Sequence, residues 1–152
     1  MLNNMKKFSF RLESVLRVRK IEEDLAKAEL IAKNSAVDSA RRELEERKAA
    51  YETTSTQNTK SAIVTVSDVM AARNRAELSG QRLIAAEAAL HEARNAAQVA
   101  QVGYADAAAK TKAIGKLRET AFEEFQALAL RDEQNELDDL ASTRKLLSSG
   151  AA

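Results

Sequence analysis

His91 is the one histidine of the sequence, and histidine is the side chain that most often exchanges protons or binds metals near neutral pH. A zinc site needs three or four ligands, and the chain has no cysteine and no second histidine. His91 lies beside Leu90 and outside the apolar heptad positions of its segment. We therefore expect a solvated surface residue and no metal site.

Carboxylates are numerous, but a pair of carboxylates acts as general acid and base only where burial shifts one of them. A long helical chain with 31% charged residues offers solvated faces instead. The four glycines, at positions 80, 103, 115 and 150, are scattered and form no phosphate-binding loop. We predict that the chain is not an enzyme, with no catalytic, cofactor-binding or metal-binding residue and no cofactor.

Basic side chains are the remaining candidates, because they recognise acidic partners. Residues 1–20 hold six basic residues and one acid, a net charge of +5, and residues 110–118 hold four basic residues and no acid. Residues 119–141 carry eight acids and one arginine, a net charge of −7. A basic-region zipper needs a continuous basic helix, whereas Phe8, Phe10 and Leu12 interrupt this one. Nucleic acid is therefore a disfavoured partner.

A heptad stripe in the second half of the chain must position these groups. Its members are Val69, Ala72, Ala76, Ser79, Leu83, Ala86, Leu90, Ala93, Ala97, Ala100, Tyr104, Ala107, Thr111 and Ile114. Only Ser79 and Thr111 are not apolar, which predicts a coiled-coil helix roughly 70 Å long. A helix of this length needs a second helix alongside it.

The first half supplies that second helix. Its apolar residues include a heptad-like set, Val18, Ile21, Leu25, Ala28 and Ala32, followed by Val37, Ala40, Leu44 and Tyr51. Short polar residues from 53 to 61 favour turns and end the pattern. Ser67 or Asp68 is the expected N-cap of the next helix. Residues 63–66 are β-branched, and their apolar members either fold back on the tip of the hairpin or contact a partner there.

The predicted fold is all-α, a long antiparallel two-helix coiled-coil hairpin whose second helix overhangs at its C-terminal end. We expect one elongated domain over residues 1–152, with helix 1 at about 8–53, a connection at 54–67, helix 2 at 68–147 and a flexible tail at 148–152. A turn centred near residue 60 places residue i opposite residue 120 − i. The two basic blocks then meet at the open end, and residues after about 113 have no partner helix.

Two properties of this hairpin follow from its composition. The overhang keeps apolar residues from Ile114 to Leu147, which bind a partner, meet the folded-back N-terminus or self-associate. The Ala-rich seam buries little apolar area, and Gly80, Gly103 and Gly115 lower helix propensity by roughly 1 kcal/mol each. We expect a marginally stable hairpin that gains order from a partner.

Three segments in order carry a more specific pattern. Residues 8–19 read F-x-F-x-L-x-x-V-L-x-x-R; residues 114–118 are similar to a basic x-E-K-L-R element, with Gly115 in place of the acid. Residues 132–141 are similar to an E-Q-K-E-L-D-E-x-A element, with Asn135 in place of a basic residue. Together they resemble the FliJ family of flagellar export proteins over nearly the whole chain.

The resemblance implies a role in the bacterial flagellar type III export apparatus and a likeness to the central stalk of rotary ATPases. It implies binding to the export ATPase hexamer and to the cytoplasmic region of the export gate, together with assistance to export chaperones. The expected location is cytoplasmic, peripheral at the inner face of the cell membrane without membrane insertion. The expected state is a monomer or a weakly self-associating chain.

Read onto this sequence, the resemblance suggests two sets of binding residues. The expected ATPase-binding residues are Arg11, Arg17, Lys20, Lys116 and Arg118. The expected gate-binding residues are Leu44, Tyr51, Val69, Met70 and Arg73. A solvated charge cluster is the alternative for the first set, and packing in the seam is the alternative for the second. The alternative function is a self-assembling structural scaffold that uses the apolar stripe at 114–147.

Overall fold

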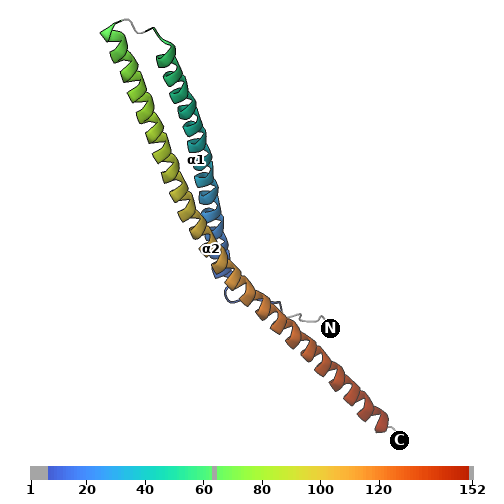
Figure 1. The fold of residues 1–152 in the computed structure, drawn as a ribbon. Coiled ribbons are helices and arrows are strands. Elements are labelled where there is room, and N and C mark those ends of the chain that lie inside the picture. The colour runs from blue at the N-terminus through green and yellow to red at the C-terminus, as the bar shows by residue number, and fades with distance from the viewer. Residues whose placement is uncertain (1–6, 63–64, 151–152) are drawn as a thin grey trace. The chain divides into compact units, whose positions relative to one another are not determined.

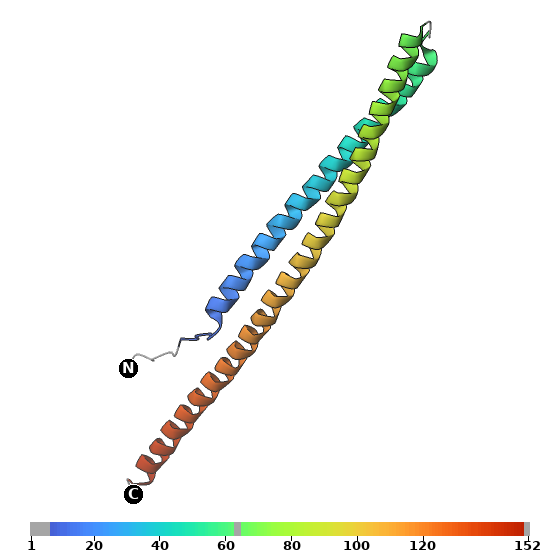
Figure 2. The ribbon, with the colours of Figure 1, turned by 90° about the vertical axis from the view of Figure 1, so that its left-hand side faces the viewer.

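The computed structural model describes residues 7–62 and 65–150. It contains two helices, α1 at Glu13–Lys60 and α2 at Val66–Ser149, which pack against each other, and no strand among these residues. In two perpendicular views α1 runs alongside α2 in the opposite direction (Figure 1, Figure 2). The predicted all-α helical hairpin is confirmed.

The chain divides into two compact units. The hairpin unit comprises Glu22–Ala107, including the end of α1 and the start of α2. The terminal unit comprises Met1–Ile21 together with Ala108–Ala152. The single elongated domain of residues 1–152 stays a prediction, and we describe each unit by itself.

The helix bounds differ from the predicted ones. Helix α1 ends at Lys60 and not near residue 53. The threonines that suggested a turn place their hydroxyl groups in hydrogen bonds within the helix instead. The hydroxyls of Thr53, Thr56 and Thr59 donate to the carbonyls four residues earlier, at 2.9, 2.9 and 2.8 Å. With no glycine or proline between residues 53 and 61, nothing breaks the helix.

Helix α2 begins at Val66, two residues before the predicted start, and continues to Ser149. Thr65 caps it, and neither Ser67 nor Asp68 is the N-cap. The backbone N–H of Asp68 donates to Thr65 Oγ1 at 3.2 Å, and the N–H of Thr65 donates to Asp68 Oδ2 at 2.9 Å. This reciprocal pair is a capping box with Asp68 at the third helical position. Of the predicted loop at 63–66, residues 63 and 64 lie outside the described part of the chain.

The predicted heptad stripe of α2 is confirmed as the seam. Twelve of its fourteen members are buried or half-buried, and only Val69 and Ala76 are exposed. Leu44 of α1 packs with Ala86 and Leu90 of α2, and the surrounding apolar contacts come from Val37, Ala40 and Leu83. Among the described residues only five apolar side chains are buried, so the seam is as thin as its alanine content predicts.

The predicted seam of α1 is wrong between residues 18 and 32. Val18, Ile21 and Leu25 are 53%, 54% and 66% exposed. The seam-facing residues of α1 include Leu16, Arg19, Glu23, Ala26, Leu30, Lys33, Val37, Ala40, Leu44, Arg47, Thr54 and Asn58. Their spacing alternates between three and four residues almost throughout. The long charged side chains among them pack in the seam with their aliphatic stems.

The register also differs from the predicted one. Thr111 Oγ1 donates to the carbonyl of Arg19, and Asn58 Nδ2 donates to the carbonyl of Ala72, both at 3.0 Å. In both units residue i therefore lies opposite roughly residue 130 − i, and not 120 − i. The error arises because α1 is longer than predicted, which moves the turn toward the C-terminus.

Residues before α1 pack on α2 as well. Phe8 precedes the helix, and its ring lies 5.1 Å from the ring centroid of Phe122 and 5.5 Å from that of Phe125. Helix 1 was predicted to begin near residue 8, but α1 begins at Glu13 and Phe8 lies in the non-helical segment before it. The observed register places Phe8 opposite residue 122, where its ring contacts are found. Residues up to Phe125 are therefore packed within the terminal unit, although the overhang was predicted to begin after residue 113, and residues 126–149 are all exposed.

Candidate functional site

The side chains that most often bind metals are spread along the described part of the chain. Among the described residues no group of three or more His, Cys, Asp and Glu could hold a metal ion. His91 is exposed, as predicted, and its Nε2 lies 3.3 Å from Nδ2 of Asn95. The two sets of binding residues expected from the sequence contain both exposed and buried side chains.

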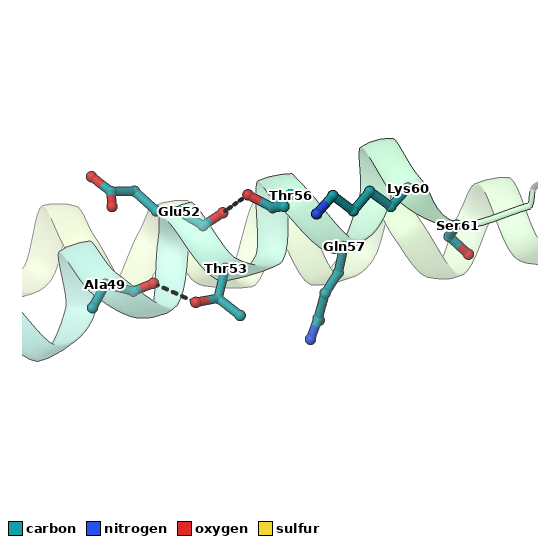
Figure 3. Close-up of a pocket in the computed structure, with 7 residues that line it drawn as sticks. All are labelled: Ala49, Glu52, Thr53, Thr56, Gln57, Lys60 and Ser61. Carbon is teal, nitrogen blue, oxygen red and sulfur yellow. Dashed lines mark hydrogen bonds between the residues drawn. The ribbon is translucent and has the colours of Figure 1, made fainter.

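A shallow hollow lies on the last turns of α1 (Figure 3). It is lined by Ala49, Glu52, Thr53, Thr56, Gln57, Lys60 and Ser61. The hydroxyls of Thr53 and Thr56 donate to carbonyls of their own helix. Figure 3 shows the carboxylate of Glu52 and the amide of Gln57 pointing in different directions. The hollow therefore lacks polar groups aimed at one point.

The five predicted ATPase-binding residues all belong to the terminal unit. We call this set, Arg11, Arg17, Lys20, Lys116 and Arg118, the basic collar. All five side chains are exposed, and the antiparallel register brings the α2 members opposite the first turn of α1. The terminal unit thus presents the positive charge that the sequence places at residues 1–20 and 110–118.

Arg118 is held in place more firmly than the sequence suggested. Its Nε donates to Glu13 Oε2 at 3.0 Å, and its guanidinium carbon lies 5.8 Å from the centre of the Phe8 ring. The two side chains of the ion pair are 46% and 49% exposed, so the pair contributes at most about 1 kcal/mol. The cation–π contact adds roughly 0.5–1 kcal/mol. Together they fix the direction of one member of the basic collar.

The aromatic cluster of Phe8, Phe122 and Phe125 did not emerge from sequence reasoning. A signal for it exists, because the four phenylalanines of the chain occur only at positions 8, 10, 122 and 125. Antiparallel pairing with the correct register brings these two pairs to the same end. The edge-to-face contact of Phe8 with Phe122, at an interplanar angle of 75°, is a favourable geometry for aromatic rings.

The five predicted gate-binding residues all lie in the hairpin unit but do not form one surface. Leu44 is 7% exposed and belongs to the core, so its side chain is not available to a partner. Tyr51 packs near Gly80 and not opposite Val69, since a Cβ on Gly80 would lie 3.8 Å from the tyrosine ring. Val69, Met70 and Arg73 are exposed in the first two turns of α2.

A polar clamp at the tip was also missed. Asn58 donates from Nδ2 to the carbonyl of Ala72 at 3.0 Å and accepts from Arg75 Nη2 at Oδ1 at 3.2 Å. The two contacts join the last turn of α1 to the second and third turns of α2. The clamp fixes the surface from which Val69, Met70 and Arg73 project.

Within residues 7–62 and 65–150, no helix is long and apolar enough to cross a membrane. Comparison with protein families matches residues 8–148 to the family described as flagellar FliJ protein. No curated protein and no solved structure matches the chain. Family members are structural components of flagellar export. Since the match covers almost the whole sequence, the chain belongs to the FliJ family and has a role related to flagellar export.

Proposed function

We propose that the chain is a stalk-like accessory of the export ATPase, bound to the ATPase ring through its terminal unit and to the export gate through the tip of its hairpin unit. Family membership supports the association with the export apparatus. The exposed basic collar is the observation that supports the proposed contact with the ATPase ring. In this proposal the chain is not an enzyme, assists export chaperones and works in the cytoplasm at the inner face of the membrane.

The charge of the collar suits a ring whose pore presents carboxylates. Charged contacts of this kind speed association and fix orientation more than they raise affinity, and salt screens them. Arg118 loses little side-chain freedom on binding, because Glu13 and the Phe8 ring already hold its guanidinium group. We therefore expect binding that weakens as ionic strength rises.

The test of the ring contact is ATP hydrolysis by the cognate hexamer, with and without this chain. The wild-type chain should stimulate hydrolysis, and Arg11→Glu combined with Lys116→Glu should remove most of the stimulation. The matched control is Arg82→Glu with Arg94→Glu, which makes the same change of charge at exposed positions of the hairpin unit. The ring proposal fails if the wild-type chain has no effect, or if both double variants behave alike.

The test of the gate contact is binding of the gate's cytoplasmic region to the full chain. Val69 and Met70 are 50% and 61% exposed, so their replacement by serine should not disturb the seam. We expect Val69→Ser with Met70→Ser to weaken binding at least tenfold, the loss of about 1.4 kcal/mol. Ile84→Ser, at a position that is 67% exposed farther along α2, is the control. Equal affinities of the two variants would argue against the tip as the gate contact.

The alternative function, a scaffold built on the apolar stripe at 114–147, receives less support. Ile114, Ala121 and Phe125 are half-buried inside the terminal unit. The stripe is therefore partly occupied by the chain itself, and only its C-terminal part is open to another molecule.

A further inference from the structure

The C-terminal part of α2 carries an apolar face that no described residue covers. Every residue from 126 to 149 is exposed. Leu130, Leu137, Leu140 and Leu147 are 68%, 54%, 67% and 73% exposed. Four leucines with this exposure on one helix need an explanation other than the seam.

These leucines do not continue the face of α2 that packs within the terminal unit. Heptad steps from Phe125 along that face lead to Leu128, and then to Asp132, Asn135 and Asp139. The four leucines lie roughly a third of the way round the helix from this line, at 100° per residue. The apolar pattern thus changes face where the contacts of the terminal unit end, so the leucines form a separate surface.

The new face follows its own heptad pattern. Its positions are Leu130, Glu133, Leu137, Leu140, Arg144 and Leu147, which we call the C-terminal stripe. The spacing alternates between three and four residues throughout, as in a coiled-coil seam. Leu137, Leu140 and Arg144 also line a shallow hollow on the helix. The stripe has the form of one half of a short coiled coil about 27 Å long.

The C-terminal stripe is complementary to itself in the antiparallel direction. If a second copy lies antiparallel with Leu137 opposite Leu140, then Leu130 lies opposite Leu147, and the residue numbers of facing positions sum to 277. In the same register Glu133 lies opposite Arg144 of the second copy. All six positions of the stripe are therefore matched, apolar with apolar and acid with base.

A parallel pairing of the same stripe is unfavourable. It would place Glu133 against Glu133 and Arg144 against Arg144, and like charges in a seam repel. Asp132, Asp138 and Asp139 fall on the outer positions of the heptad and do not oppose the antiparallel arrangement. Glu136 flanks the seam, where in this register it lies near Thr143 of the second copy and meets no acid. The two charged positions of the stripe thus favour an antiparallel copy over a parallel one.

We propose that two copies of this chain associate as an antiparallel dimer through residues 130–147 of α2. The interface has only four leucines from each copy, so it is smaller than a standard stable interface and the dimer forms in roughly the micromolar range. This goes beyond the proposed ATPase and gate contacts, which use the basic collar and the tip. Dimer formation would make the oligomeric state of the chain depend on its concentration.

The first test measures the mass of the full chain by sedimentation over a range of concentrations. The wild-type chain should change from monomer to dimer, whereas Leu137→Ser should stay monomeric at least tenfold higher in concentration. Leu128→Ser is the matched control, because Leu128 is 58% exposed but lies on the other face. Circular dichroism verifies that both variants remain helical.

Charge reversal tests the pairing itself. Glu133→Arg alone, or Arg144→Glu alone, should weaken the dimer roughly tenfold, since the Glu133–Arg144 contact occurs twice in each dimer. The two single variants mixed with each other should associate about as well as wild type, because each then meets the opposite charge. In a parallel pairing the single variants would keep the two like-charge contacts of wild type and would not weaken the dimer, and the mixture would associate more tightly than wild type. Weakening by each single variant together with recovery only to the wild-type level therefore indicates the antiparallel register.

Disulfide trapping tests the direction, and the chain is suited to it because it has no cysteine. A mixture of the Leu130→Cys and Leu147→Cys variants should form a mixed disulfide, whereas each variant alone should form few. Efficient self-crosslinking of Leu130→Cys alone would show parallel pairing and overturn the proposal. A wild-type chain that remains monomeric up to about 100 μM would overturn it as well.

Discussion

Replacing the interior glycines of α2 by alanine should stabilise the chain. Gly103 and Gly115 lie inside the helix, and a Cβ added at either position meets no atom within 4 Å, so alanine fits without strain. Glycine costs roughly 0.8–1.0 kcal/mol relative to alanine inside a helix, because it loses more backbone entropy on folding. The double variant should therefore gain about 2 kcal/mol.

Gly80 offers a comparison within the seam. A Cβ at this position would lie 3.8 Å from the ring of Tyr51, which is an ordinary van der Waals contact. Gly80→Ala should therefore gain the same helix propensity and a small additional contact. A gain no smaller than that of Gly103→Ala is the expected result.

Urea unfolding followed by circular dichroism measures these changes. For a slope of 1–3 kcal/mol per molar urea, a gain of about 2 kcal/mol moves the midpoint by roughly 1 M. Gly150→Ala is the control, because Gly150 lies beyond the last residue of α2 and should leave the midpoint unchanged. An unchanged or lower midpoint for Gly103→Ala with Gly115→Ala would refute the reasoning. Glycine would then be required for a reason other than helix formation.

Three further substitutions probe the seam, the cap and the aromatic cluster. Leu44→Ala should lower the free energy of unfolding by about 2 kcal/mol, while Leu25→Ala, at a position that is 66% exposed, should cost less than about 0.5 kcal/mol. Asp68→Ala should cost about 1 kcal/mol through loss of the capping box, and Ser67→Ala should cost much less. Phe8→Ala should speed amide hydrogen exchange before α1 by releasing its ring contacts, with little change in global stability.

Each of these three predictions can be contradicted by one measurement. Similar costs at positions 44 and 25 would mean that burial in the seam does not determine stability. A larger cost at position 67 than at position 68 would place the N-cap at Ser67, two residues after Thr65. Unchanged exchange before α1 in Phe8→Ala would mean that the aromatic cluster does not hold this segment.

The α2 seam was predictable because nearly every position in it is apolar, so the heptad pattern is visible without knowledge of the partner. The α1 seam was not, because Arg19, Glu23 and Lys33 occupy seam positions while Val18 and Ile21 are exposed. Facing small alanines, the stems of long charged residues fill the space and their charged groups remain in water. A pattern search that sorts residues only into apolar and polar misplaces such a seam.

The position of the turn explains most of the remaining differences. Thr53 and its neighbours have modest helix propensity, but their hydroxyls bond within the helix, and Asn58 gains partners on α2. Propensity is a weak argument where tertiary contacts are present. The resulting shift of about ten residues in register separated Tyr51 from Val69. It also placed Phe8 against the aromatic pair of α2 instead of near residue 112.

The charge pattern of the sequence predicted the location of the basic collar but not the contacts of its members. The sequence was sufficient to place all five residues in one unit, because antiparallel pairing brings the two basic blocks together. It did not indicate that Arg118 is engaged by Glu13 and Phe8, since that contact depends on the register and on the non-helical segment before α1. The assignment of the collar to the ATPase ring stays a prediction.

Two hydrogen bonds that join a side chain of one helix to the backbone of the other have a mechanical consequence. Thr111 binds the backbone of α1 in the terminal unit, and Asn58 binds the backbone of α2 in the hairpin unit. Sliding one helix along the other by a heptad, about 10 Å, breaks each of these bonds, whereas the alanines between them offer little resistance to separation. Each unit is therefore stiff against shear and weak against peeling, so a force along the helices is transmitted while a sideways force opens the pair.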